Sequence, residues 1–258
     1  MTTDGNPAPD RHWFEDVADH LGPAYLRYSF TMGTRQEVDF LVDQLGLGPG
    51  STVVDVGCGP GRHSLEFARR EIAVVGIDIS HEFIRVAQAN ATAEGLDHLT
   101  EFRREDARSF ELDQPVDAAI SLCQGAFGLG GYPDPDDPQN LIPDESVLTC
   151  IRNALRPGGR AAVSAFSAYF QVRWLEDQDS FDAASGVNHE TTELRNSDGD
   201  VIDGELWTTC YTPRELHMIA ERAGLVVDRI TSVSPGAYGL TQPTIESHEF
   251  LLLVTRAN

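Results

Sequence analysis

Three glycines, Gly57, Gly59 and Gly61, stand at alternate positions in the stretch VVDVGCGPGRH. Since glycine carries no Cβ, a turn of this composition lets a ligand lie close against the backbone. Two acids follow at the ends of later strand-like runs, where carboxylates can bind a nucleoside: Asp78 could accept from both hydroxyls of a ribose, and Asp106 from an adenine amino group. The pattern predicts a site for a ligand that contains both groups.

The spacing of the glycines distinguishes between ligands. Dinucleotide-binding turns carry G-x-G-x-x-G and place a pyrophosphate at the start of the next helix. Here Arg62 occupies the sixth position, and Gly61 comes one residue earlier. A nicotinamide dehydrogenase is therefore disfavoured, whereas a ligand without phosphates needs only a backbone that does not clash with a ribose and an amino-acid tail. Asp55, inside the run before the turn, is costly to bury unless it has partners.

Short β-branched runs alternate with amphipathic segments along the chain, and these elements must position the turn and the acids. Such alternation indicates a parallel sheet with helices on both faces. The segment HETTELRNSDGDVIDGELWTTC instead predicts a hairpin inserted after the fifth strand. Ser80 and Thr212 are predicted N-caps. The expected strands are residues 52–56, 72–80, 99–106, 116–123, 160–167, 225–233 and 248–256, and the expected helices are 13–21, 34–47, 63–70, 80–95, 144–156 and 212–224.

Composition limits the possible partners. The 258 residues suffice for one α/β domain with a small inserted subdomain. Nineteen Lys and Arg against 41 Asp and Glu give a net charge of −22, which argues against nucleic acid and anionic membranes as partners. Four scattered cysteines form no CxxC pair, and the proline-rich loop with Asp134, Asp136 and Asp137 is interpreted as solvated, so no metal is expected. Without a signal pattern or a long apolar run, we expect a cytoplasmic protein.

Five ordered motifs together identify a family. The segments VVDVGCGPGRHS, VVGIDIS, FRREDARSF, VDAAISLCQGAFG and LRPGGRAAVS resemble the successive motifs of class I S-adenosylmethionine-dependent methyltransferases, in their small-molecule branch. The resemblance covers residues 34–256, most firmly 53–164. It implies a Rossmann-like, doubly wound α/β fold. The sheet would be mostly parallel and seven-stranded with an antiparallel last strand, accompanied by an N-terminal helical lid and a small β insertion after strand five.

The resemblance also implies which residues bind the cofactor. The three glycines would let the methionine tail pass over the turn, and Asp55 would hold the turn's backbone or the cofactor's amino group. Asp78 would bind the ribose hydroxyls, with Ile79 packing on the adenine. Arg35 is either a partner of the cofactor carboxylate or a surface arginine. The expected cofactor site comprises Asp55, Gly57, Cys58, Gly59, Gly61, Asp78, Ile79, Asp106, Ala107, Cys123, Gln124 and Arg35.

The segment before the first strand is either plain core packing or a lid over the substrate pocket. Aromatic side chains there would contact the acceptor or, through cation–π attraction, the sulfonium. The sequence does not single out a general base. His63, Tyr25 and His12 are the candidates, and the alternative role for His63 is a helix cap or a contact to the cofactor. The expected acceptor contacts are Tyr25, Tyr28, Phe30, Phe127, Tyr169 and Trp174.

The implied activity is in-line transfer of a methyl group from S-adenosylmethionine to a small-molecule O, N or C nucleophile, which leaves S-adenosylhomocysteine. The run CQGAFGLG departs from the Asn/Asp-Pro-Pro-aromatic run of methyltransferases that act on nucleic-acid or protein amino groups. A protein acceptor and a non-catalytic S-adenosylmethionine-binding protein stay as alternatives. We expect a tail and lid in residues 1–34, a methyltransferase domain in 35–258 with an inserted substrate-side segment in 168–211, and a monomer or homodimer.

Overall fold

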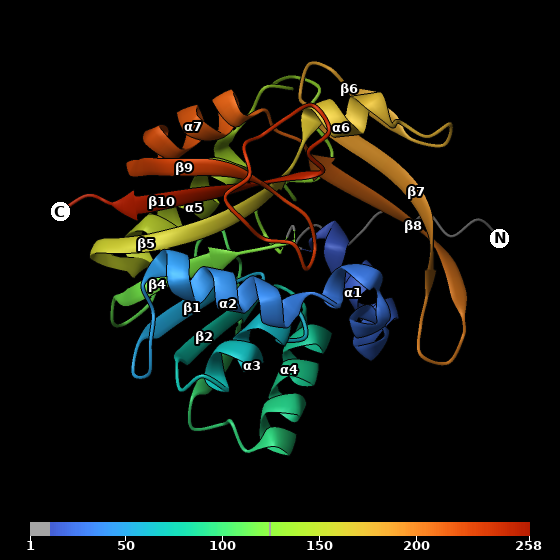
Figure 1. The fold of residues 1–258 in the computed structure, drawn as a ribbon. Coiled ribbons are helices and arrows are strands. Elements are labelled where there is room, and N and C mark those ends of the chain that lie inside the picture. Colours follow the sequence, from blue (N-terminus) through green and yellow to red (C-terminus); the bar gives the residue numbers. More distant parts are fainter. Residues whose placement is uncertain (1–10, 124) are drawn as a thin grey trace.

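A seven-stranded sheet organises the chain in the computed structural model, which describes residues 11–123 and 125–258. The strand order is β3-β2-β1-β4-β5-β10-β9, and β10 alone runs antiparallel to its two neighbours. The predicted mostly parallel sheet with an antiparallel last strand is therefore confirmed (Figure 1). The strands are β1 (Thr52–Val56), β2 (Ala73–Asp78), β3 (Thr100–Arg104), β4 (Val116–Ser121), β5 (Leu155–Phe166), β9 (Leu225–Val233) and β10 (Glu249–Arg256).

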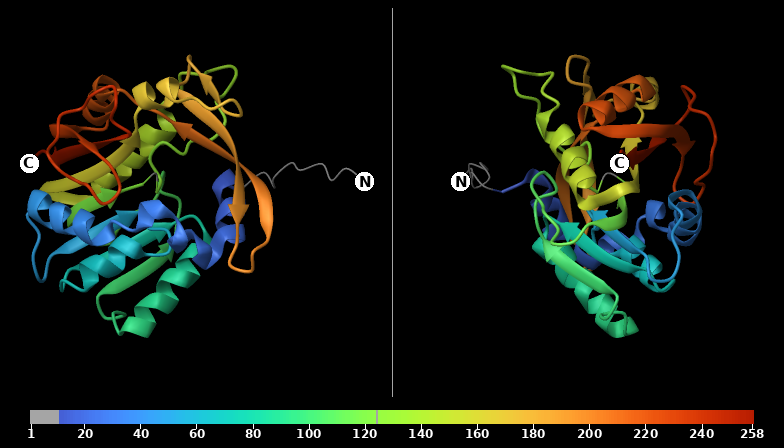
Figure 2. Two further views of the ribbon diagram at one scale, coloured as in Figure 1. Left: turned by 45° about the vertical axis from the view of Figure 1, so that its right-hand side comes forward. Right: turned by 90° about the vertical axis from the view of Figure 1, so that its left-hand side faces the viewer.

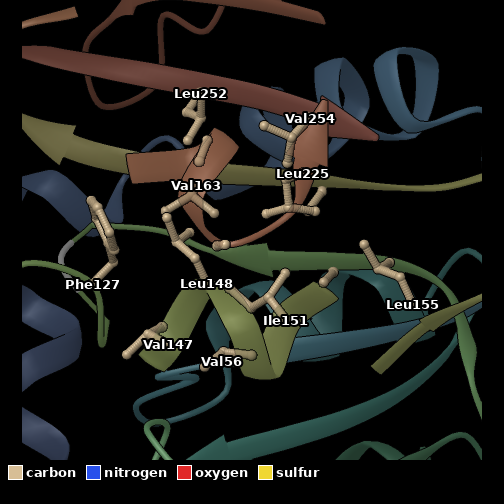
Figure 3. Packing of buried hydrophobic residues seen from close by; sticks show 14 of the residues in the cluster. Val56, Phe127, Val147, Leu148, Ile151, Leu155, Val163, Leu225, Leu252 and Val254 are labelled. Carbon is tan, nitrogen blue, oxygen red and sulfur yellow. The ribbon is translucent and has the colours of Figure 1, made fainter. Parts of the chain in front are cut away.

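Helices cover both faces of this sheet. On one face, α2 (Thr34–Leu45) and α3 (Arg62–Ala68) bury Val38, Leu41 and Phe67, and Figure 1 shows both helices on the near side. On the other face, α5 (Ile142–Ala154) and α7 (Pro213–Arg222) form the larger core, part of which Figure 3 shows around Leu148 and Ile151. The helix α4 (His81–Glu94) packs beside β3. This arrangement leaves the carboxyl ends of the parallel strands as the edge available for a site.

Local capping explains where several helices begin. Ser80 Oγ accepts from the Phe83 N–H at 3.1 Å at the start of α4. Thr212 forms a capping box with Glu215 ahead of Pro213, so both predicted N-caps are confirmed. The helix expected over residues 144–156 instead spans Ile142–Ala154. Leu155 is instead the first residue of β5, because it pairs with Val116 of β4 and is fully buried there.

The segment after β5 forms a separate small sheet. It begins with α6 (Ala168–Arg173), and its strands are β6 (Ser180–Asp182), β7 (Val187–Arg195) and β8 (Val201–Thr209). The hairpin of β7 and β8 was predicted, whereas the three-residue β6 is too short to give a sequence pattern. Figure 2 shows this hairpin reaching away from the main sheet toward the N-terminal helix.

The N-terminal helix α1 (Trp13–Leu21) packs against the hairpin rather than against the main sheet. Val17 and Leu21 of α1 share a small core with Leu194 of β7, and the Trp13 ring meets the Trp207 ring edge-on at 5.4 Å. Two 3-10 turns, Gly22–Arg27 and Ser29–Thr31, lead from α1 to α2. In the described part of the chain, no helix has the length and apolar character needed to cross a membrane.

Candidate functional site

A cavity that opens to solvent lies at the carboxyl ends of β1, β2 and β3. The segment after β4, the first turn of α5 and the start of α1 complete its wall. Six of the residues singled out from the sequence line it: His12, Gly57, Asp78, Ile79, Asp106 and Ala107.

The three glycines of the turn serve different purposes. All have the left-handed backbone that favours glycine, with φ of 75° at Gly57, 55° at Gly59 and 83° at Gly61. A Cβ on Gly57 would lie 2.0 Å from the Gly125 carbonyl, so this glycine lets the segment after β4 approach the cavity. A Cβ on Gly61 would lie 3.0 Å from the Cβ of Ala87 on α4. Gly57 thus shapes the cavity, and Gly61 lets the start of α3 pack closely against α4.

Asp78 is the buried acid of the cavity wall. Its carboxylate accepts backbone N–H bonds from Gly59 and Ser80, each at 2.8 Å. Burial raises the pKa of Asp78 to about 6, although both of these hydrogen bonds act in the opposite direction. The strand end and the glycine turn therefore hold this carboxylate rigidly against the cavity.

Asp106 and Ala107 line the cavity beyond the end of β3. Burial raises the pKa of Asp106, but hydrogen bonds from the Arg108 guanidinium and backbone N–H outweigh this effect and lower it overall. Arg108 itself lines the cavity beside the acid, and sequence reasoning did not single it out. Ile79 adds an apolar residue to the same lining. Two carboxylates and an apolar side chain in one cavity are the groups that a ribose and an adenine require.

Asp55 and Cys58 lie near the turn without lining the cavity. Both are buried, and Asp55 accepts a hydrogen bond from Ser64 Oγ at 2.6 Å. Burial raises the pKa of Asp55, and the Ser64 contact partly offsets this. Asp55 thus links β1 to α3, and the Ser64 hydroxyl is the partner that this buried acid requires.

His63 is held inside the protein rather than at the cavity. It is 5% exposed, and its Nε2 lies 2.8 Å from the Glu37 carboxylate. Arg62 donates to the same carboxylate at 2.6 Å and to Cys123 Sγ at 2.8 Å. Burial lowers the pKa of His63, and the neighbouring Arg62 lowers it further. His63 therefore has a structural partner in Glu37, which no sequence motif had marked because it is one acid among several on α2.

Of the aromatic and imidazole groups around α1, His12 and Phe14 line the cavity, whereas Tyr25 and Tyr28 do not. His12 caps α1, and its Nε2 lies 3.0 Å from the Leu129 carbonyl oxygen. Tyr25 packs against Phe83 with ring centroids 4.9 Å apart, and Tyr28 lies next to it. Gln124 and the side chain of Phe30 lie outside the described residues.

Four further residues named from the sequence lie elsewhere. Arg35 is exposed on α2. Phe127 is buried in the core, stacked on Tyr211, as Figure 3 shows for its position among apolar neighbours. Tyr169 is 44% exposed on α6, and Trp174, which follows α6, is 56% exposed. None of the four lines the cavity.

Asp144 is a site residue that sequence reasoning missed. It lines the cavity from the first turn of α5, accepts from the Gly128 N–H at 2.9 Å and bonds the Tyr211 hydroxyl. Burial raises the pKa of Asp144. The only sequence signal was an acid in the first turn of a helix, which is a common stabilising feature. In residues 11–123 and 125–258, no group of His, Cys, Asp and Glu is arranged to hold a metal ion.

The chain is similar in sequence to a known protein family and to several named relatives. Residues 47–224 match the family model described as a methyltransferase domain. The chain is 30% identical over 130 residues to a ubiquinone biosynthesis O-methyltransferase of Aeromonas salmonicida, covering 50% of this chain and 49% of that one. It is 32% identical over 114 residues to a phosphatidylethanolamine N-methyltransferase of Cereibacter sphaeroides, covering 44% and 50%. The chain thus spans about half the length of the curated relatives it matches.

Solved structures share the whole fold. The CcbJ methyltransferase from Streptomyces caelestis superposes with a TM-score of 0.73 at 16% identity, covering 96% of this chain and 97% of that one. An S-adenosylmethionine-dependent methyltransferase from Clostridium acetobutylicum gives 0.68 at 15% identity, covering 95% and 98%. At these identities the likeness concerns the fold alone.

Proposed function

The chain belongs to the methyltransferase-domain family, and we propose that it transfers a methyl group from S-adenosylmethionine to an O, N or C nucleophile of a small molecule. The observation that carries the proposal is the buried Asp78 carboxylate, fixed by the Gly59 and Ser80 N–H groups at the wall of the cavity. The oxygens of that carboxylate would accept the ribose hydroxyls.

The rest of the cavity fits the adenosine part of this cofactor. Ile79 would pack on the adenine face, Asp106 would accept from its amino group, and the Ala107 N–H would reach a ring nitrogen. Gly57 lines the cavity at the turn that the methionine part would cross, and its bare Cα lets the backbone at Gly125 close the wall there. The remaining predicted contacts do not line the cavity, and we assign them to support of its wall: Asp55, Cys58, Gly59, Gly61 and Cys123.

The chemistry requires little of the protein beyond positioning. When bound, the cofactor supplies a methyl group that is already activated as a sulfonium. The chain's residues would hold the donor at the strand ends, exclude water and align the nucleophile for in-line displacement. A general base helps where the nucleophile must first lose a proton. Because His63 has Glu37 as a close partner, we assign it to positioning the start of α3 rather than to proton transfer.

We propose that α1 and the β7–β8 hairpin act as one cover over the site. His12 and Phe14 of the α1 region line the cavity, and Trp13 joins this region to Trp207 of the hairpin. This supports dividing the chain into a cover-forming segment up to residue 34 and a methyltransferase domain in 35–258, with 168–211 inserted on the substrate side.

Several observations support a small acceptor. The net charge of −22 is unsuited to a polyanion. The relatives include enzymes named for ubiquinone biosynthesis and for phosphatidylethanolamine, and solved neighbours include an amino pentose methyltransferase and a glycopeptide N-methyltransferase. These names cover both oxygen and nitrogen nucleophiles, so they leave the attacked atom open.

A methyl-label experiment tests the proposal. The protein is incubated with S-adenosylmethionine labelled on the methyl group and with a cell extract, and the products are separated by size. We expect label in the small-molecule fraction with the native protein and with Asp39→Asn, a surface control, but not with Asp78→Asn. Label on protein or RNA would overturn the small-molecule acceptor. A protein that binds the cofactor yet transfers no label would support a non-catalytic role.

A further inference from the structure

Cys123, which follows β4, has a backbone conformation that few residues other than glycine adopt. Its φ is 52°, and in the described part of the chain Glu71 is the only other non-glycine residue with a positive φ. This left-handed conformation costs a residue with a Cβ roughly tenfold in a conformational equilibrium. Such strain persists only where the surrounding structure holds it, and it clusters at functional sites. The contacts of Cys123 therefore indicate what the strained turn does.

The turn at Cys123 leads the chain from the end of β4 into the wall of the cofactor cavity. The Gly125 N–H donates to the Leu122 carbonyl oxygen at 3.0 Å, which closes the turn. The backbone of Gly125 then lies so close to Gly57 that a Cβ on Gly57 would be 2.0 Å from the Gly125 carbonyl. Gly57, Gly125 and Ala126 all line the cavity. The strained residue thus stands at the start of the segment that closes this wall.

Two side chains from other elements hold Cys123 in place. The Ser164 hydroxyl of β5 accepts from the Cys123 N–H at 2.8 Å, and Ser164 is fully buried. The Arg62 guanidinium, at the start of α3, donates to Cys123 Sγ at 2.8 Å. Burial raises the pKa of Cys123 to about 12, so the sulfur belongs to a neutral thiol that accepts this hydrogen bond. The backbone and the side chain of Cys123 are therefore bound at separate points.

Arg62 is itself fixed through its other terminal nitrogen. Its Nη1 donates to Thr34 Oγ1 at 2.7 Å and to the Glu37 carboxylate at 2.6 Å, and both partners belong to α2. The Arg62 side chain is 9% exposed, and the Glu37 side chain is fully buried. Because a guanidinium presents its N–H groups in a planar fork, Arg62 binds α2 through Nη1 and Cys123 through Nη2. A lysine carries a single nitrogen and could not reach both at this spacing.

We propose that Arg62 is a positioning residue for methyl transfer: it holds Cys123 in the left-handed conformation and thereby fixes the cavity wall that begins at Gly125. This inference rests on the proposed function. Arg62 does not line the cavity, so its influence on a ligand there passes through Cys123. The same arginine occupies the sixth position of the glycine motif, where a dinucleotide-binding turn has its third glycine. The departure from that motif thus has a structural role in this chain.

Substitutions at Cys123 separate the anchoring contact from the strain. Binding of S-adenosylhomocysteine is measured by calorimetric titration of the native protein and of three variants. Cys123→Ala keeps the Cβ and the strain but loses the contact with Arg62, so its affinity should fall roughly tenfold. Cys123→Ser retains an acceptor for Arg62 and Cys123→Gly has no strain to offset, so both should stay within about threefold of the native affinity. Glu71→Gly, which relieves the same strain at a residue that does not line the cavity, should leave the affinity unchanged.

A double-mutant cycle tests whether Arg62 acts through Cys123. Arg62→Lys keeps a positive charge beside Glu37 but lacks the fork, so it should weaken S-adenosylhomocysteine binding roughly tenfold. In the Cys123→Gly protein the same change should have less than about a twofold effect, because the turn no longer needs the anchor. Equal losses in both backgrounds would overturn the inference, as would native affinity in Cys123→Ala. Thermal melting confirms that each variant is folded, and if Arg62→Lys is not, the Cys123 series decides.

Amide hydrogen exchange gives a second readout that needs no ligand. It is followed by mass spectrometry of the ligand-free protein in a peptide that contains residues 125–130. Exchange there should be roughly tenfold faster in Cys123→Ala and should keep its native rate in Cys123→Gly and Glu71→Gly. Equal rates in the two Cys123 variants would count against the inference. A native protein that fails to bind S-adenosylhomocysteine would instead count against the proposed function, so the two failures are distinguishable.

Discussion

The Asp78 carboxylate accepts a hydrogen bond from the backbone N–H of Gly59 at 2.8 Å, which joins the end of β2 to the glycine turn after β1. The two residues lie in different motifs, and each fixes the position of the other. A ligand that engages Asp78 therefore meets a turn that is already arranged for it. Such preorganisation lowers the entropic cost of ordering the site on binding.

Replacing Asp78 by Asn should weaken S-adenosylhomocysteine binding about 100-fold. The amide retains one oxygen acceptor but loses the charge-assisted hydrogen bonds, which are worth about 1.5–3 kcal/mol each. Calorimetric titration at pH 7.5 measures the change. The surface variant Asp39→Asn should bind as the native protein does. Native affinity in the Asp78→Asn protein would show that the ribose does not rest on this carboxylate.

The raised pKa of Asp78 should appear in the stability of the ligand-free protein. Because its folded pKa of about 6 lies above the ordinary 3.8, the folded state holds the proton more tightly. The free energy of unfolding should then fall as the pH rises from about 4 to 6, by roughly 3 kcal/mol at about 1.4 kcal/mol per pKa unit. Urea unfolding across this range, compared with Asp78→Asn, which lacks only this titrating group, measures the difference. Parallel curves for the two proteins would contradict it.

Gly57→Ala should damage both stability and cofactor binding. The new Cβ would meet the Gly125 carbonyl at 2.0 Å, and the φ of 75° is strained for alanine. We expect a loss of about 3 kcal/mol in unfolding free energy or a displaced loop after β4. Gly48→Ala is the matched control, since nothing lies within 4 Å of its Cβ position. Equal unfolding curves for both variants would refute the steric argument.

Glu37→Gln should destabilise the protein by about 3 kcal/mol, since Arg62 would lose its buried carboxylate partner. Burial alone would raise the pKa of Glu37, but His63 and Arg62 lower it to about 2. The stabilisation should therefore be complete above about pH 4.5 and disappear as the pH falls toward 2. Denaturant unfolding at pH 7 and pH 3 measures both effects. Glu193→Gln, on an exposed position of β7, should unfold like the native protein at each pH.

Trp13→Ala should loosen the cover while leaving the core intact. It removes the edge contact with Trp207 and the Nε1–H bond to the Leu129 carbonyl at 3.4 Å. Aromatic pairs of this kind contribute about 0.5–1.5 kcal/mol, so we expect S-adenosylhomocysteine to dissociate about tenfold faster. Stopped-flow displacement gives the rate. Trp174→Ala, which changes an exposed tryptophan beyond α6, should not alter it.

The motifs predicted those parts of the site that follow directly from parallel strands. Asp78, Ile79, Asp106 and Ala107 come together because the carboxyl ends of neighbouring parallel strands share one edge. Phe127 and Trp174 lie in segments without such a register, where burial alone decides whether an aromatic side chain faces a site, the core or solvent. The Glu37–His63 contact joins two helices, and no periodicity in either helix records which side chains meet across it.

The Leu129 carbonyl oxygen accepts contacts from both His12 and Trp13, while Leu129 itself lines the cofactor cavity. One peptide group thus links the proposed cover to the cavity wall that S-adenosylmethionine would contact. Because both contacts end on this group, a ligand that orders the wall would also favour a closed cover, and opening of the cover would loosen the wall. On the proposed function, binding of the methyl donor would therefore favour closure of the proposed cover around the acceptor.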